Sequence, residues 1–148
     1  MELKTASQII SFAKKFEEDS AKLYQDLAER YGRAREILLS FAEENRKNIV
    51  QIERTYYEVI TDAIEGCFSF KVDPDEYTLN TKLVDNASYS NALHMAIDIE
   101  QTIMQFYSAA AEQSQSLLAD VSRLFTKIAK KRDDRKLKVE LLLRDKQH

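Results

Sequence analysis

Near the C-terminal end of the chain, two arginines interrupt an apolar stripe at its centre. Arg132 and Arg135 occupy helical positions where aliphatic side chains would continue the pattern. The stripe within residues 121–142 consists of Val121, Leu124, Phe125, Ile128, Val139 and Leu142. A helix with this pattern turns both guanidinium groups toward the core, where an unpaired charge is very costly. The chain must therefore fold so that other segments bring carboxylates to the level of these arginines.

Few residues in the chain break regular structure. Its 148 residues include two glycines and one proline, and 32% of them are charged while 44% are hydrophobic. This composition is typical of long amphipathic helices, and the length suits one domain with its own core. We therefore expect a single all-α domain over residues 1–148.

Apolar residues at helical spacing predict four helices. These run from about Ser7 to Tyr31, from Arg33 to Ile64, from Asn91 to Gln115, and from Ser116 or Leu117 to Arg144. Thr5 and Gln8 have the spacing of a capping box before the first helix, and Gly32 is expected to end it. Ser90 is expected to cap the third helix.

The segment 65–89, between the second and third helices, has no sustained apolar period and contains the only proline. At roughly 3.3 Å per extended residue, it is long enough to run from one end of a helical bundle to the other. A long crossover after a helical hairpin is a known way to build a four-helix bundle. We therefore expect a four-helix bundle with a long crossover between the second and third helices.

The other three helices also carry polar residues at the centre of their inward stripes. Glu17 lies in the first, Asn45 and Asn48 lie in the second, and Glu100 lies in the third. A single glutamate in such a place often sits at the edge of the stripe and reaches water, and two core amides often bond to a neighbouring helix. The arginines favour instead a shared polar layer that contains both glutamates.

The two halves of the chain repeat one pattern, which is harder to explain by chance than any single residue in it. Ala13-x3-Glu17-x5-Leu23-Tyr24 corresponds to Ala96-x3-Glu100-x5-Phe106-Tyr107, and Asn45-x2-Asn48 corresponds to Arg132-x2-Arg135. Tyr24 and Tyr107 each follow a glutamate by seven residues. These tyrosines either bond within the polar layer or serve as core aromatics with their hydroxyls at its rim, and the pattern leaves both options open.

With this repeat the chain resembles the rubrerythrin-type members of the ferritin-like di-iron proteins. Those bundles carry one glutamate on each of two helices and a Glu-x-x-His motif on each of the other two. The segments EEDSAKLYQDLAE and DIEQTIMQFYSAAAEQS resemble the single-glutamate helices, and FAEENRKNIVQIE and IAKKRDDRKLKVELL resemble the Glu-x-x-His helices. The resemblance covers nearly the whole chain apart from the crossover, and it implies a ferritin-like fold and an iron-dependent redox activity.

The ligand positions of that family are only partly retained. Glu17 and Glu100 match the single-glutamate positions, while the two Glu-x-x-His motifs are replaced by Asn45 with Asn48 and by Arg132 with Arg135. Cys67 is the only cysteine, so the cysteine pairs of full rubrerythrins are missing. A register shift of one residue would offer Glu44, but that residue lies roughly 100° around the helix from Asn45 and restores no histidine.

These replacements change the charge balance of the site. Arginine has no lone pair to offer a metal and does not lose its proton in a protein. Two glutamates and two arginines sum to zero, so a divalent ion would add positive charge beside two guanidinium groups. We therefore expect the arginines to replace the metal in a core polar network with no cofactor and no catalytic residue. Its expected members are Glu17, Glu100, Asn45, Asn48, Arg132, Arg135, Tyr24 and Tyr107.

Two functions are compatible with this pattern. The first is a non-catalytic binding or structural protein with a protein or small-molecule partner, whose di-iron site has been lost. The alternative is a rubrerythrin-like, iron-dependent oxidoreductase that reduces peroxide or oxygen, with a reduced metal site in which Glu17 and Glu100 are the residual ligands. The fold by itself is only weak evidence for the oxidoreductase function.

The remaining features concern partners and location. The net charge of −3 gives no general case for nucleic acid, and the basic residues within 127–138 do not share one helix face. The chain shows neither a signal peptide nor an apolar run long enough to cross a membrane, so we expect a cytoplasmic protein. A homodimer is expected, because ferritin-like bundles often pair side by side. Candidates for its interface, or for covering by the crossover, are Tyr57, Ile60, Phe68 and Phe70.

Overall fold

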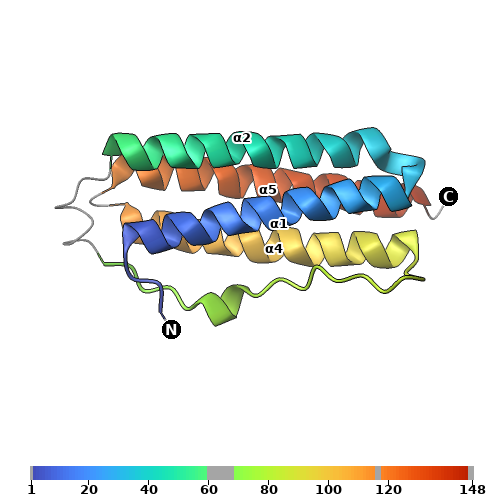
Figure 1. Cartoon of the computed structure of the whole chain (residues 1–148), viewed down its shortest axis with the longest axis horizontal. Helices are drawn as coiled ribbons and strands as arrows, with labels where there is room; N and C mark the ends of the chain where they lie inside the picture. Colours follow the sequence, from blue (N-terminus) through green and yellow to red (C-terminus); the bar gives the residue numbers. More distant parts are fainter. Residues whose placement is uncertain (1, 60–68, 116–117, 147–148) are drawn as a thin grey trace.

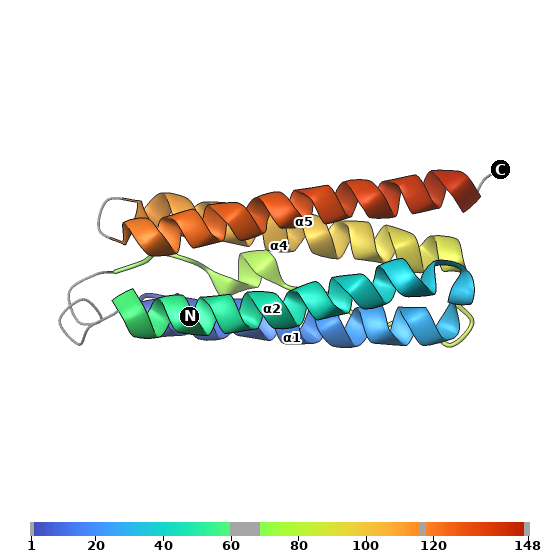
Figure 2. The same cartoon turned by 90° about the horizontal axis from the view of Figure 1, so that it is seen from above.

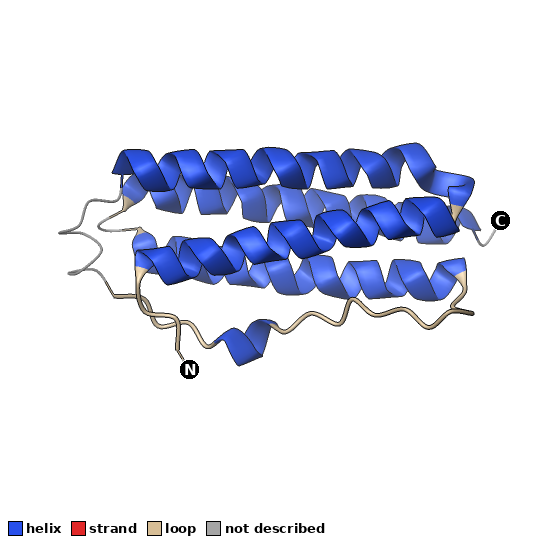
Figure 3. Ribbon diagram, in the orientation of Figure 1, coloured by secondary structure: helices blue, strands red, loops and turns tan. Residues whose placement is uncertain are grey.

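Four long helices make up most of the computed structural model, which describes residues 2–59, 69–115 and 118–146. They are α1 (Ala6–Arg30), α2 (Arg35–Val59), α4 (Tyr89–Ser114) and α5 (Ala119–Lys146), with short 3-10 turns η1 (Gly32–Ala34) and η2 (Pro74–Tyr77). Figure 3 shows helices and loops but no strand in the described ranges. The prediction of an all-α chain is therefore confirmed.

The helices pair into two hairpins that face each other. α1 packs along α2 and α4 packs along α5, while α2 with α5 and α1 with α4 make the contacts between the hairpins. Figure 2 shows the two hairpins side by side along their whole length. The inward faces of the helices share one continuous apolar core. No helix in the described part of the chain combines the length and apolar character needed to span a membrane.

Local signals explain where α1 begins and ends. Thr5 Oγ1 accepts a hydrogen bond from Gln8 N at 3.1 Å, and Gln8 Oε1 accepts one from Thr5 N at 3.1 Å, which completes the predicted capping box. The helix ends at Arg30, one residue before the predicted end, and η1 leads directly into α2. Gly32 lies in that turn without a left-handed φ. The predicted end of the second helix, Ile64, lies outside the described residues.

α4 begins two residues earlier than predicted because a different serine caps it. The backbone of Ser88 is extended, and its Oγ accepts a hydrogen bond from Asn91 N at 3.0 Å. The expected cap, Ser90, therefore lies inside the first helical turn. α5 begins at Ala119 and continues to Lys146, two residues beyond the predicted end at Arg144. Residues 116–117, where its start was predicted, lie outside the described ranges.

The described part of the connection between α2 and α4 runs along the helices beside α4 (Figure 1). Leu3 N donates to Val72 O at 2.7 Å and Val72 N donates to Leu3 O at 3.3 Å, so the start of the chain pairs with this segment. The ring of Tyr77 packs edge-on against Phe106, with centroids 5.7 Å apart. The connection is therefore fixed by backbone bonds at one end and by an aromatic contact in its middle.

The residues expected at a dimer interface differ in their exposure. Tyr57 is 79% exposed, whereas Phe70 is only 1% exposed and belongs to the core. Phe70 N also donates to Lys4 O at 2.7 Å. Phe70 therefore anchors the connection and is not available for an interface. Ile60 and Phe68 lie outside the described residues.

Candidate functional site

Arg132 and Arg135 lie about one turn apart on α5 and face the interior of the molecule. Their side chains are 0% and 1% exposed. Glu17 on α1 and Glu100 on α4 face them and are also fully buried. Large charged side chains are rarely buried to this extent unless they are paired. The helices thus bring the polar centres of their inward stripes into one layer.

Arg132 bridges the two buried glutamates. Its Nη1 donates to Glu100 Oε1 at 2.8 Å and to Glu100 Oε2 at 3.0 Å. Its Nη2 donates to Glu17 Oε2 and, at 3.0 Å, to Ser20 Oγ. One planar guanidinium therefore satisfies carboxylates from two different helices, which is the geometry that favours arginine over lysine. The buried ion pairs predicted from the sequence are present.

Arg135 connects this layer to α2. Its Nη1 donates to Asn45 Oδ1 at 2.7 Å and more weakly to Glu100 Oε1 at 3.3 Å. Its Nη2 donates to Glu44 Oε1 at 2.5 Å. The guanidinium carbon also lies 5.0 Å from the centroid of the Phe41 ring, a distance suited to a cation–π contact. Because Glu44 is 36% exposed, this ion pair links the buried network to the surface.

The two tyrosines cross between the halves of the chain. Tyr24 OH donates to Glu100 Oε1 at 2.6 Å, and Tyr107 OH donates to Glu17 Oε2 at 3.0 Å. Each hairpin therefore supplies a hydroxyl to the glutamate of the other hairpin. The sequence left two roles open for these tyrosines. In the structure, both hydroxyls bond within the polar layer.

The asparagines satisfy only part of the remaining hydrogen-bonding capacity. Asn48 Nδ2 donates to Glu17 Oε1 at 2.7 Å, and Asn45 accepts from Arg135. Asn45 Nδ2, Asn48 Oδ1 and the Nε atoms of both arginines have no partner within the described part of the chain. The amides thus orient the ionic groups, but they do not complete the network.

The two buried glutamates hold Arg132 in its charged form. Burial by itself would lower the pKa of Arg132, but Glu100 and Glu17 beside it hold that pKa well above its usual value. The fully buried pairs carry a formal sum of zero, with two carboxylates and two guanidinium groups. Glu44 adds one negative charge at the solvent side, where water can screen it.

The two buried tyrosines are held neutral. Burial raises the pKa of Tyr24 and of Tyr107 well above the usual value of 10.0, and the adjacent charges of Glu100 and Glu17 raise these pKa values further. Arg135 and Arg132 oppose this effect without reversing it. Both hydroxyls therefore remain hydrogen-bond donors at neutral pH.

The donor set at this layer does not fit a di-iron centre. Both oxygens of Glu17 and both oxygens of Glu100 already accept hydrogen bonds from arginine, asparagine or tyrosine. Arg132 and Arg135, which replace one Glu-x-x-His motif, have no lone pair for a metal. His94 is exposed on α4. Within the described ranges, no group of three or more histidine, cysteine, aspartate or glutamate residues could hold a metal ion.

Sequence reasoning missed two members of the network. Ser20 lies on the inward stripe of α1, and its hydroxyl accepts from Arg132 while donating to Phe16 O at 2.6 Å. The sequence pattern presents Glu44 only as a poor substitute for Asn45, yet it pairs with Arg135. The signal that could have found them is the number of donors, because two arginines offer about ten N–H groups whereas two glutamates and two amides provide only about six oxygen atoms.

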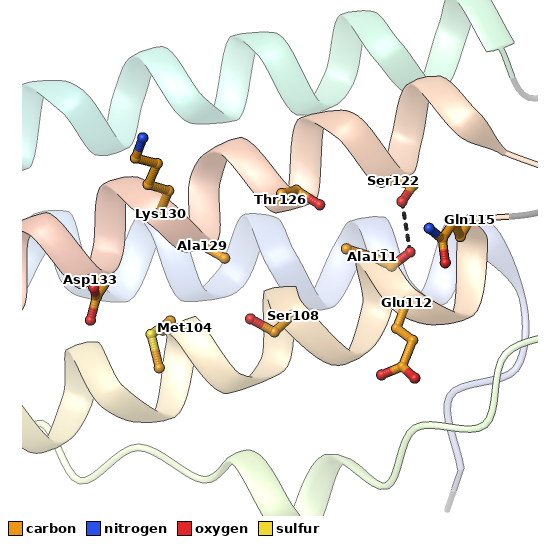
Figure 4. A pocket seen from close by; sticks show the side chains of 10 residues that line it. All are labelled: Met104, Ser108, Ala111, Glu112, Gln115, Ser122, Thr126, Ala129, Lys130 and Asp133. Atoms are coloured by element: carbon orange, nitrogen blue, oxygen red, sulfur yellow. Dashed lines mark hydrogen bonds between the residues drawn. The ribbon is translucent and has the colours of Figure 1, made fainter.

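A hollow of about 510 Å³ lies between α4 and α5, apart from this network. Figure 4 shows Ser108, Ala111 and Ala129 along it, and the hydroxyl of Ser122 donates to Ala111 O at 2.8 Å. None of the network residues lines this hollow. Of its charged residues, Lys130 and Glu112 are exposed and Asp133 is half-buried. The hollow therefore offers no buried charged group to a ligand.

We expect Glu17→Ala and Glu100→Ala each to lower the free energy of unfolding by about 3–5 kcal/mol, because each would remove one of the two carboxylates that pair with the buried guanidinium of Arg132. Chemical denaturation measures the effect. Glu18→Ala, at the exposed neighbouring position, is the matched control and is expected to change stability by about 0.5 kcal/mol or less. Buried variants that behaved like this control would contradict the ionic network.

The buried tyrosines predict a loss of stability at alkaline pH. A tyrosine whose pKa is raised by folding contributes stability below its unfolded pKa of about 10, and this contribution is lost as pH rises above that value. Ultraviolet titration should therefore show that two of the seven tyrosines ionise only as the chain unfolds. In Tyr24→Phe and Tyr107→Phe, one fewer tyrosine should show this delay. Ionisation of all seven with native circular dichroism retained would contradict the assignment.

Comparison of the chain with models of known protein families, with curated proteins and with solved structures finds no match. The resemblance to rubrerythrin-type proteins therefore stays a prediction from the sequence. The chemistry open to the site must therefore be read from its own geometry. The carboxylates of Glu17 and Glu100 accept hydrogen bonds from donors within the protein. Glu44 is the network member that is partly exposed.

Proposed function

We propose that this chain is a ferritin-like, rubrerythrin-like four-helix bundle whose di-iron site has been replaced by an arginine–glutamate network. In this proposal it acts as a non-catalytic binding or structural protein. The internal repeat, the two facing hairpins and the connection that runs along α4 support the bundle assignment. The observation that carries the functional part is the position of Arg132 between Glu17 and Glu100.

A metal ion at this layer would have to displace the hydrogen bonds that the two glutamates already accept. A divalent cation between Glu17 and Glu100 would replace at least two charge-assisted hydrogen bonds from Arg132. The displaced guanidinium would then remain in a buried position beside a cation, where like charges repel strongly. The network therefore disfavours iron through its own charges as well as through its missing ligands.

The proposed role of the network is to align the two hairpins. Its bonds join α1, α4 and α5 through Arg132, and they join α2 to α5 through Arg135. A buried ionic network need not add net stability over an apolar core, but it can disfavour other alignments of the same helices. We take that as its function here, with binding carried out by the outer surface.

Iron binding tests this proposal. Titrated anaerobically with ferrous iron after metal-free purification, the wild-type chain is expected to retain no iron in equilibrium dialysis, because Arg132 and Arg135 keep both glutamates occupied. The variant Arg132→Glu with Arg135→His restores one Glu-x-x-His motif and is expected to bind more iron. A pair of ferrous ions retained by the wild-type chain would overturn the proposal. That result would favour the alternative, an iron-dependent reduction of peroxide or oxygen.

We further propose that two copies of the chain associate through the outer face of α2. Leu39, Val50 and Tyr57 are separated by 11 and 7 residues, which places them on one side of the helix, and they are 37%, 54% and 79% exposed. In an antiparallel arrangement about a two-fold axis, Leu39 of one copy would meet Tyr57 of the other. The same arrangement places Glu43 of one copy opposite Glu53 and beside Arg54 of the other, so Arg54 supplies a positive charge next to Glu43.

Sedimentation velocity over a range of concentrations tests the dimer. Tyr57→Arg is expected to shift the chain toward the monomer, because it places a charge at the most exposed apolar position of this face. Val84→Arg, at a 66% exposed position on the connection, is the matched control and should leave the association unchanged. A wild-type chain that stays monomeric at high concentration would contradict this proposal.

A further inference from the structure

A polar groove between α2 and α5 is lined by Glu44, a partner of Arg135. Its volume is about 440 Å³, and α2 contributes residues at positions 40, 44, 47 and 51, which follow one helix face. α5 contributes Lys131 and Lys138. These two lysines lie four residues before and three residues after Arg135, so all three share one side of α5. The buried guanidinium thus lies on the side of α5 that forms this groove.

Glu44 is the partner of Arg135 that can be exchanged. The other acceptors of this guanidinium, Asn45 and Glu100, are fully buried, whereas the side chain of Glu44 lines the groove and is 36% exposed. If the Glu44 side chain turned outward, its carboxylate would regain water and leave no buried negative charge. It would free Nη2 of Arg135, whose Nε already lacks a partner in the described structure. Another carboxylate could then take its place.

The charges around the groove favour an anion in that place. Lys47, Lys131 and Lys138 line it, and none of them forms a salt bridge within the part of the chain that the structure describes. These lysines supply three positive charges against the two negative charges of Glu43 and Glu44, while the buried Arg135 is balanced by Glu100. The surplus is concentrated on the α5 side, next to the position that the Glu44 carboxylate occupies.

The side-chain oxygen of Gln51 indicates a further group that a ligand of this groove would carry. Gln51 lines the groove, and its buried Oε1 has no hydrogen-bond partner among the described residues. An unsatisfied buried acceptor is matched by a ligand hydroxyl or amine that donates to it. The groove volume is also within the range of small-molecule sites.

We propose that this groove binds a small hydroxy-dicarboxylate. One carboxylate replaces that of Glu44 on the guanidinium of Arg135, and the second is held by Lys131 and Lys138. The hydroxyl donates to Gln51 Oε1. A planar carboxylate suits this position because Arg135 already holds one there, and the guanidinium fork pairs well with such a group.

This inference goes beyond the proposed function and can fail separately from it. The groove lies outside the layer of Glu17 and Glu100, so iron binding does not decide whether the groove takes an anion. The ligand would join α2 to α5 in place of the internal Glu44–Arg135 pair. Binding of this kind stabilises the native state in proportion to the logarithm of ligand concentration, which gives a second measurement.

Isothermal titration calorimetry with L-malate at neutral pH and constant ionic strength tests the site. The wild-type chain is expected to bind one malate with a dissociation constant in the millimolar range or tighter. Lys131→Met and Lys138→Met should each weaken binding by about threefold to fivefold, the loss expected for one partly exposed ion pair. Glu44→Gln should strengthen binding, because it removes the competing carboxylate. Lys22→Met, at an exposed position on α1, is the matched control and should have no effect.

Three results would overturn the proposal. The first is the absence of malate binding to the wild-type chain, judged both by calorimetry and by the lack of a rise in melting temperature. The second is equally tight binding of sulfate, which would show general attraction of anions instead of a carboxylate site. The third is unchanged or weaker affinity in Glu44→Gln, provided that circular dichroism shows this variant to be folded.

Discussion

A guanidinium held between two buried carboxylates is the interaction on which the rest of this structure depends. Arg132 reaches from α5 to Glu100 on α4 and to Glu17 on α1, so three helices are aligned by one planar group with a fixed geometry. The carboxylates and this guanidinium offset the cost of burying one another, and Arg135 adds a second, longer contact to Glu100 at 3.3 Å. A shift of any of these helices by one residue would rotate an ionic group out of this layer. The apolar core makes the helices associate, whereas the ionic layer restricts how they align.

The network is nearly symmetric in its hydrogen bonds but not in its charges. Tyr24 and Tyr107 each bond to the glutamate of the opposite hairpin, as residues do across a two-fold axis, and this agrees with the internal repeat of the sequence. The matching positions on α2 and α5 differ, because α2 carries asparagines where α5 carries arginines. Charge balance gives a reason for the difference. Two glutamates need two positive charges, and arginines on both helices would leave a buried excess.

Because donors within the protein occupy the buried carboxylates, the groups that stay open to a ligand lie nearer the surface. Within the described part of the chain, each oxygen of Glu17 and Glu100 has an internal donor, and Arg132 is enclosed. Arg135 differs because one of its partners, Glu44, is partly exposed and lines a groove with three lysines. A buried charge with one exchangeable partner at a groove is a place where a ligand can act on the arrangement of two helices. The proposals on ligand and dimer both concern α2, on neighbouring faces of that helix that share Glu43.

Local rules were enough to predict much of this protein. Periodicity identified the four helices, and the spacing of Thr5 and Gln8 identified the start of α1. The inward position of Arg132 implied a buried carboxylate partner. Each of these signals is carried by residues that lie close together in the sequence. Which groups meet was decided by the tertiary structure. Glu44 reaches Arg135, and Phe70 turns into the core, because the distance between helices and the path of the connection bring them there. The sequence by itself determined that charged groups are buried, whereas only the packed helices decided which of them pair and which one remains open to solvent.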